Sequence, residues 1–103
     1  MAIKKLGASA PTATTNTTVY TVPALKSAVA NINLVNTGAA TITVRLAIAA
    51  TGTPGASEWI EYGATITPYG VLERTGIAMS AAENVVVYTD IATLAVRVHG
   101  VEE

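Results

Sequence analysis

The 103-residue sequence contains no cysteine and no phenylalanine, and only one histidine, one aspartate and one tryptophan. Without cysteine, disulfide bonds, thiol catalysis and thiolate metal sites are excluded. Charged residues make up 13% of the chain, against roughly a quarter in an average soluble protein, and the net charge is -1. This balance argues against a basic, phosphate-binding surface and against an enzyme rich in acid–base groups.

Long apolar runs are also missing. No uninterrupted stretch reaches the roughly 18 apolar residues of a membrane-spanning helix, and Met1–Leu6 is not followed by the apolar run of a signal peptide. We therefore expect a protein that is assembled in a cytoplasm, without membrane or nucleic-acid partners and without metal or cofactor.

The apolar half of the chain consists of small and β-branched residues. It contains 19 Ala, 12 Val and 8 Ile beside 16 Thr, but only 6 Leu. Val, Ile and Thr favour strands because branching at Cβ restricts the side chain in a helix. The composition predicts an all-β domain with a thin core.

Alternating apolar residues and turn signals predict seven antiparallel strands, over 17–22, 27–36, 41–50, 58–67, 71–79, 85–89 and 93–101. Their spacing is typical of a β-sandwich or jelly-roll-like domain. The clearest local pattern is at 27–36 and 41–50, which we expect to pair as a hairpin across the turn Asn36-Thr37-Gly38. The inward-facing residues predicted for one core are Ile32, Leu34, Ile42, Val44, Leu46 and Ile48.

Residues 1–16 differ from the rest of the chain. Ala, Thr, Ser, Gly7 and Pro11 follow each other there with neither a helical nor a strand period. The segment is predicted to be an extended arm without secondary structure of its own that becomes ordered against another chain, while 17–103 form the single sandwich domain.

Three groups of polar residues are candidates for chemical sites. Glu58, Glu61 and Glu73 could form the carboxylate pair of a glycosidase, but they are better explained as solvated strand residues. The lone His99 lacks metal-ligand partners and a serine in a nucleophile-elbow context. The loop Gly52-Thr53-Pro54-Gly55 lacks the lysine and the helix of a phosphate-binding loop.

The aromatic residues give the better candidates. Trp59 and Tyr62 are either core aromatics or interface anchors, since both types are enriched at binding hot spots. Val85, Val86 and Val87 place apolar groups on both faces of one strand, so this strand is either covered on both sides or meets another subunit. The residues predicted to lie at an interface are Trp59, Tyr62, Val86, Tyr88, Leu6 and Pro11.

Three segments carry a resemblance to a known family. They are LGASAPTATTNTTVYTVPA at 6–24, SAVANINLVNTGAATITVRLAIAATG at 27–52 and VVVYTDIATLAVRVHGVEE at 85–103. In order and spacing they resemble a family of small virion structural proteins of tailed bacteriophages. The resemblance implies a β-sandwich subunit of the phage particle and brings no catalytic motif.

The leading hypothesis is accordingly a capsid decoration (cement) subunit, located in the virion, whose partners are the major capsid or tail proteins. A tail, collar or fibre component is the alternative within the same particle. A host-receptor or carbohydrate-binding module is the alternative from another class. The thin core and the doubly apolar strand 85–89 also predict a homo-oligomer, with a trimer favoured.

Overall fold

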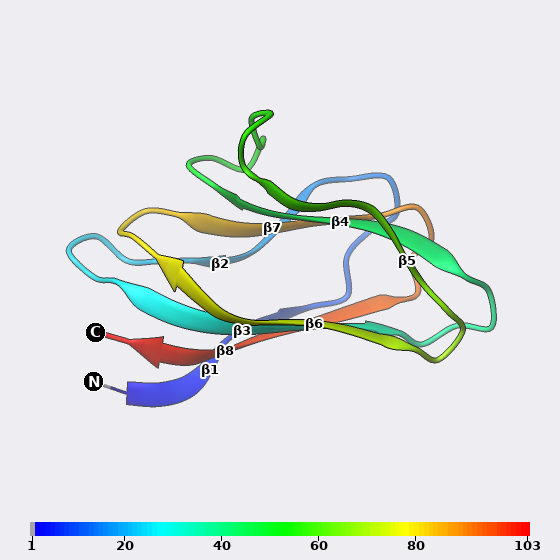
Figure 1. The fold of residues 1–103 in the computed structure, drawn as a ribbon, viewed down its shortest axis with the longest axis horizontal. Helices are drawn as coiled ribbons and strands as arrows, with labels where there is room; N and C mark the ends of the chain where they lie inside the picture. The colour runs from blue at the N-terminus through cyan, green and yellow to red at the C-terminus, as the bar shows by residue number, and fades with distance from the viewer. Residues whose placement is uncertain (1) are drawn as a thin grey trace.

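In the computed structural model, which describes residues 2–103, the chain forms eight β-strands in two four-stranded antiparallel sheets. The two sheets pack face to face as the layers of a β-sandwich (Figure 1). The prediction of an all-β fold is confirmed, with one more strand than expected. The strands are β1 (Ala2–Ser9), β2 (Thr17–Thr21), β3 (Ala28–Asn36), β4 (Ile42–Ala49), β5 (Trp59–Ile66), β6 (Val71–Met79), β7 (Asn84–Thr89) and β8 (Leu94–Glu102).

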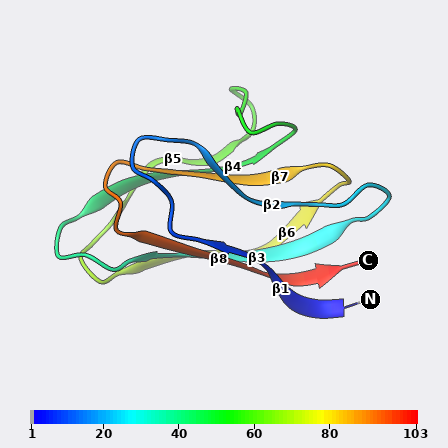
Figure 2. The ribbon, with the colours of Figure 1, turned by 180° about the vertical axis from the view of Figure 1, so that it is seen from behind.

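The strands pair in a nested order. The first sheet has the order β1-β8-β3-β6 and the second sheet the order β2-β7-β4-β5, so that β1 pairs with β8, β2 with β7, β3 with β6 and β4 with β5. Every connection except that between β4 and β5 therefore crosses from one sheet to the other. Both termini lie at one end of the first sheet, where β1 and β8 run side by side (Figures 1 and 2).

The core lies between the two sheets and is made by alternate residues of the strands. Along β3 and β4, every second side chain from Ala28 to Leu34 and from Ile42 to Leu46 is fully or almost fully buried. Five of the six predicted core residues belong to this cluster, and the sixth, Ile48, packs against it while partly exposed. The period of two in the sequence thus located the core correctly.

The predicted hairpin between 27–36 and 41–50 is wrong. β3 pairs with β6 and β8 in the first sheet, whereas β4 pairs with β5 and β7 in the second, so the two strands face each other across the core. An alternating pattern shows that one face of a strand is buried, but two strands with a buried face can meet either edge to edge or face to face.

The crossing between these strands is held by the buried side chain of Asn36. Its amide nitrogen donates to the carbonyl oxygens of Ala40 (2.7 Å), Ile66 (3.1 Å) and Thr67 (3.2 Å). Its amide oxygen accepts from the Gly38 N–H and the Thr93 hydroxyl, both at 3.0 Å. One side chain therefore joins the turn after β3 to the end of β5 and the start of β8.

The prediction that residues 1–16 lack secondary structure is wrong for half of the segment. Residues 2–9 form β1, which pairs with β8 from Ala2 opposite Glu102 to Ser9 opposite Val96. The sequence of β1 shows no alternation of apolar and polar residues, for two reasons. β1 is an edge strand that contributes little to the core, and its exposed residues include Ile3, Lys4, Lys5 and Ala8. A bulge between Lys5 and Gly7 also interrupts the alternation. Residues 10–16 have no strand and lead to the second sheet.

β1 also closes one open edge of the sandwich against β2. A Cβ atom on Gly7 would collide with the backbone carbonyl of Val19 and lie 3.4 Å from the Cβ atom of Tyr20. Leu6 and Val19 pack on the main core beside this contact. The glycine is thus required by the close approach of the two edge strands.

Candidate interaction surface

Side chains of three neighbouring strands meet on the outer face of the second sheet. Arg45 of β4 lies directly opposite Tyr62 of β5 and Tyr88 of β7. Two residues further along β4, Ala47 lies opposite Trp59 and Val86. Because directly opposed residues on one face of a sheet are neighbours, the register collects these side chains in one place.

The guanidinium of Arg45 makes cation–π contacts with two tyrosine rings. The Cζ atom of Arg45 lies 4.3 Å from the ring centroid of Tyr62 and 4.5 Å from that of Tyr88. Trp59 meets the Tyr62 ring edge to face, with the centroids 5.0 Å apart and the planes at 74°. We call Trp59, Tyr62, Arg45 and Tyr88 the aromatic–arginine surface.

The floor of this surface is fully buried. Ala47, Ala49 and Val86 have no solvent exposure and form a second small cluster, against which the partly buried Trp59 packs. Tyr62, by contrast, is 63% exposed. The surface therefore combines a rigid base with at least one ring that is open to contact.

Arg45 takes part in neither of the two ion pairs found among residues 2–103, which join Lys4 to Glu102 and Arg74 to Glu61. The guanidinium carbon lies over both tyrosine rings, and the N–H donors of a guanidinium lie in its plane. The surface thus carries a positive charge whose carboxylate partner is not supplied by the described part of the chain.

The structure brings three of the six predicted interface residues together. Trp59, Tyr62 and Tyr88 share this surface, and the central member Arg45 was missed by the sequence reasoning. The alternation of 41–50 did place Arg45 on the outward face. Its role could not be read from the sequence, because the stacking depends on which strands lie next to β4.

The other three predicted interface residues have different places. Val86 is buried beneath Trp59, because β7 is a central strand between β2 and β4 that is covered on both faces. Leu6 packs on the main core, and Pro11 is buried in the connection between the sheets. Leu6 and Pro11 lie away from the aromatic–arginine surface, and Val86 lies buried under it and is not exposed for a subunit contact.

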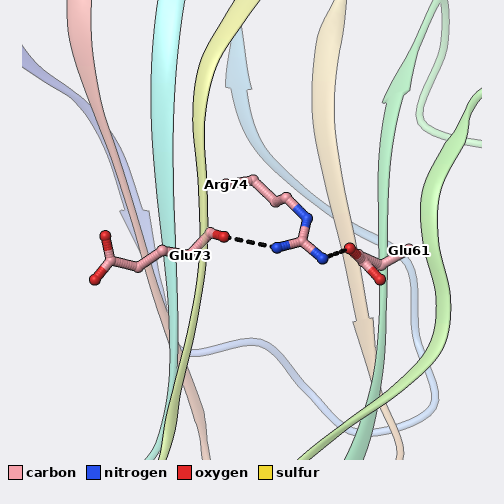
Figure 3. Close-up of polar contacts among 3 residues, drawn as sticks. All are labelled: Glu61, Glu73 and Arg74. Carbon is pink, nitrogen blue, oxygen red and sulfur yellow. Dashed lines mark hydrogen bonds and ion pairs between the residues drawn. The ribbon is translucent and has the colours of Figure 1, made fainter.

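The three glutamates considered for glycoside hydrolysis have separate partners. Glu61 of β5 forms an ion pair with Arg74 of β6, which bridges the two sheets at the edge opposite β1 (Figure 3). Arg74 also donates to the backbone carbonyl of Glu73 (2.8 Å), whose own carboxylate points away from the pair. Glu58 accepts hydrogen bonds from the backbone N–H groups of Gly55 (2.7 Å) and Ala50 (2.9 Å), which lower the pKa of its carboxyl group.

Glu58 also holds the conformation of the glycine-containing loop at 52–55. Its two backbone hydrogen bonds span the connection between β4 and β5, so the loop that faintly resembled a phosphate cradle is organised around a carboxylate. An anion at that position would meet a negative charge.

His99 lies on the outer face of the first sheet, opposite Lys5 on β1 and Asn31 on β3. With Lys5 and Arg97 it lines an open cavity of about 330 Å³. Within residues 2–103, no three His, Asp or Glu side chains are grouped in a way that could hold a metal ion. The same residues contain no helix long and apolar enough to cross a membrane.

Comparisons with protein-family models, with curated proteins and with solved structures each give no match for this chain.

Proposed function

We propose that this protein is a structural subunit of a tailed bacteriophage particle, and specifically a decoration subunit that binds the outside of the capsid. The observation that carries the proposal is the aromatic–arginine surface. Trp, Tyr and Arg are the residue types most enriched at the energetic centre of protein interfaces, and here they stand on the rigid face of a sheet.

The fold supports the same proposal. The nested pairing of eight strands in the orders β1-β8-β3-β6 and β2-β7-β4-β5 is that of a jelly roll, an architecture used by viral capsid domains and by lectin domains. The family resemblance of segments 6–24, 27–52 and 85–103 points to the virion rather than to a lectin. In this proposal the partners are capsid or tail proteins, and the subunit self-associates, with a trimer favoured.

Cosedimentation of the purified protein with empty capsids and, separately, with isolated tails tests the proposal. We expect saturable binding to capsids. Binding to tails alone would move the subunit to the tail, collar or fibre, and binding to neither particle would contradict a virion role.

Two tyrosines provide a matched pair of variants for this assay. Tyr62→Ser removes the exposed ring of the aromatic–arginine surface and should weaken particle binding at least tenfold. Tyr69→Ser removes a ring of similar exposure, 71%, from the turn between β5 and β6 and should leave binding unchanged.

A carbohydrate-binding role is the second candidate, favoured by the exposed ring of Tyr62 beside Trp59. A glycan array with the wild type and Tyr62→Ser examines it. Glycan binding that is lost in Tyr62→Ser would favour this role over capsid decoration.

A further inference from the structure

We propose that the aromatic–arginine surface is a carboxylate receptor: Arg45, held between Tyr62 and Tyr88, binds an aspartate or glutamate side chain on an acidic surface segment of a partner protein. That the partner belongs to the virion rests on the proposed function. The carboxylate chemistry of the site does not, because it follows from the geometry around Arg45.

The first argument is the state of the guanidinium. Its Cζ atom lies 4.3 and 4.5 Å from the centroids of two tyrosine rings, and no ion pair within residues 2–103 uses it. A guanidinium presents a planar fork of N–H donors that matches the two oxygens of a carboxylate. Because the rings already restrict the side chain, less conformational freedom is lost on binding.

The second argument is charge complementarity. Most carboxylates of the chain have partners of their own: Glu58 and Glu83 bind backbone N–H groups, Glu61 binds Arg74, Glu102 binds Tyr20 and Lys4, and Asp90 binds the Thr43 N–H. Two glutamates have no such side-chain contact within residues 2–103, and both lie in the other sheet or at its end: Glu73 on β6 and Glu103 directly after β8. A carboxylate that complements Arg45 would therefore come from outside the protomer.

The third argument concerns the kind of partner. Small ligands bind in concave cavities, and two cavities of about 330 and 320 Å³ are lined by residues of the first sheet and its ends, away from Arg45. The aromatic–arginine surface lies on a sheet face, and the guanidinium already covers one face of each tyrosine ring. These features favour a protein surface over a sugar that would stack on the rings.

Trp59 is the single tryptophan of the chain and touches Tyr62, so its fluorescence reports on occupancy of the surface. We would titrate the protein with a hexaglutamate peptide and, as a control, with a hexaglutamine peptide. We expect a saturable change with hexaglutamate only, which disappears at 0.5 M salt because screening weakens an exposed ion pair.

The variants separate charge from geometry. Arg45→Gln should abolish the response to hexaglutamate, and Arg45→Lys, which keeps the charge but not the fork, should weaken it at least fivefold. Arg97→Gln removes the same charge from the exposed outer face of the first sheet and should respond as the wild type does. Circular dichroism and thermal unfolding should show all three variants folded.

An absent response in the wild type, or an equal response in Arg45→Gln and the wild type, would overturn the proposal. A response to an oligoglucuronate at lower concentration than to hexaglutamate would also overturn it, in favour of an acidic glycan. If hexaglutamate binds through Arg45 but neither capsids nor tails bind the protein, the proposed function fails while the carboxylate receptor stands.

Discussion

At the scale of single residues, Asn36 is the polar group on which the fold depends most. It is fully buried, and both ends of its amide are engaged by groups from three parts of the chain. A buried polar group that loses its hydrogen-bond partner costs about 1–3 kcal/mol of stability. Replacing Asn36 would leave several of its backbone and hydroxyl partners without a hydrogen bond at once.

We therefore expect Asn36→Ala to lower the free energy of unfolding by about 3 kcal/mol, measured by urea denaturation. Asn33→Ala is the matched control, because Asn33 stands on the outer face of the same strand and is partly exposed. Equal stability of the two variants would show that the hydrogen bonds of Asn36 do not hold the crossing between the sheets.

A second, partly buried contact makes stability depend on pH. The Tyr20 hydroxyl donates to Glu102 (2.8 Å), and this hydrogen bond, with a smaller contribution from Lys4, holds the pKa of Glu102 below its usual value. Burial, together with the same hydrogen bond, raises the pKa of Tyr20. Each group thus prefers the protonation state that it has at neutral pH.

The sign of the acid effect follows from the lowered pKa. The unfolded chain takes up a proton at Glu102 near pH 4.3, whereas the folded chain does so only at lower pH, so stability falls as the pH drops below about 4.3. At the alkaline side the raised pKa of Tyr20 makes stability fall above about pH 10. Urea midpoints measured from pH 3 to 11 should show both declines, and Tyr20→Phe should reduce both; an unchanged profile in Tyr20→Phe would contradict the assignment.

At the scale of elements, the positions of the strands were predicted from the sequence more accurately than their pairing. Residues that alternate between the core and solvent located seven strands within one or two residues of their ends, since burial of one face leaves a period of two in the sequence. Pairing is decided by contacts between distant segments, and so the crossing from β3 to β4 was mistaken for a hairpin. The same limit applies to the aromatic–arginine surface. Its aromatic residues were each predicted to lie at an interface, but that they lie around Arg45 follows only from the register of β5, β4 and β7.

β1 was not predicted from the sequence, and its contribution to stability can be tested separately. Deleting residues 2–9 would expose the backbone edge of β8 and remove Leu6 from the core, so we expect the free energy of unfolding to fall by roughly 2 kcal/mol or more. Ala8→Ser, at an exposed position of the same strand, should change it little. A deletion variant as stable as the wild type in urea would restore the view of this segment as a free arm.

At the scale of the whole molecule, the structure changes the argument for self-association. The doubly apolar strand β7 is covered within one protomer, because Trp59 packs against Val86 on its outer face. The edges of the core are closed by Gly7 against Val19 and by Arg74 with Glu61. Val86→Glu would therefore place a charge in a buried cluster and disturb folding instead of testing an interface. Apolar side chains that remain exposed include Val29 and Ile3, which both lie opposite Val101 on the outer face of the first sheet.

This row, on the face opposite to the aromatic–arginine surface, is where a homotrimer would bury apolar area while leaving Arg45 free for another protein. A standard interface covers roughly 800 Å² of each partner, and each Å² of apolar area contributes about 25 cal/mol. Light scattering at tens of micromolar protein should give three times the 10.5 kDa chain mass. Val29→Glu should reduce the mass to that of one chain without loss of folding, because the side chain is 47% exposed, whereas Leu25→Glu, in the turn before β3 and 99% exposed, should remain trimeric. A wild type that stays at 10.5 kDa under these conditions would exclude the homotrimer. In that case only contacts with a partner protein would position the subunit on the particle.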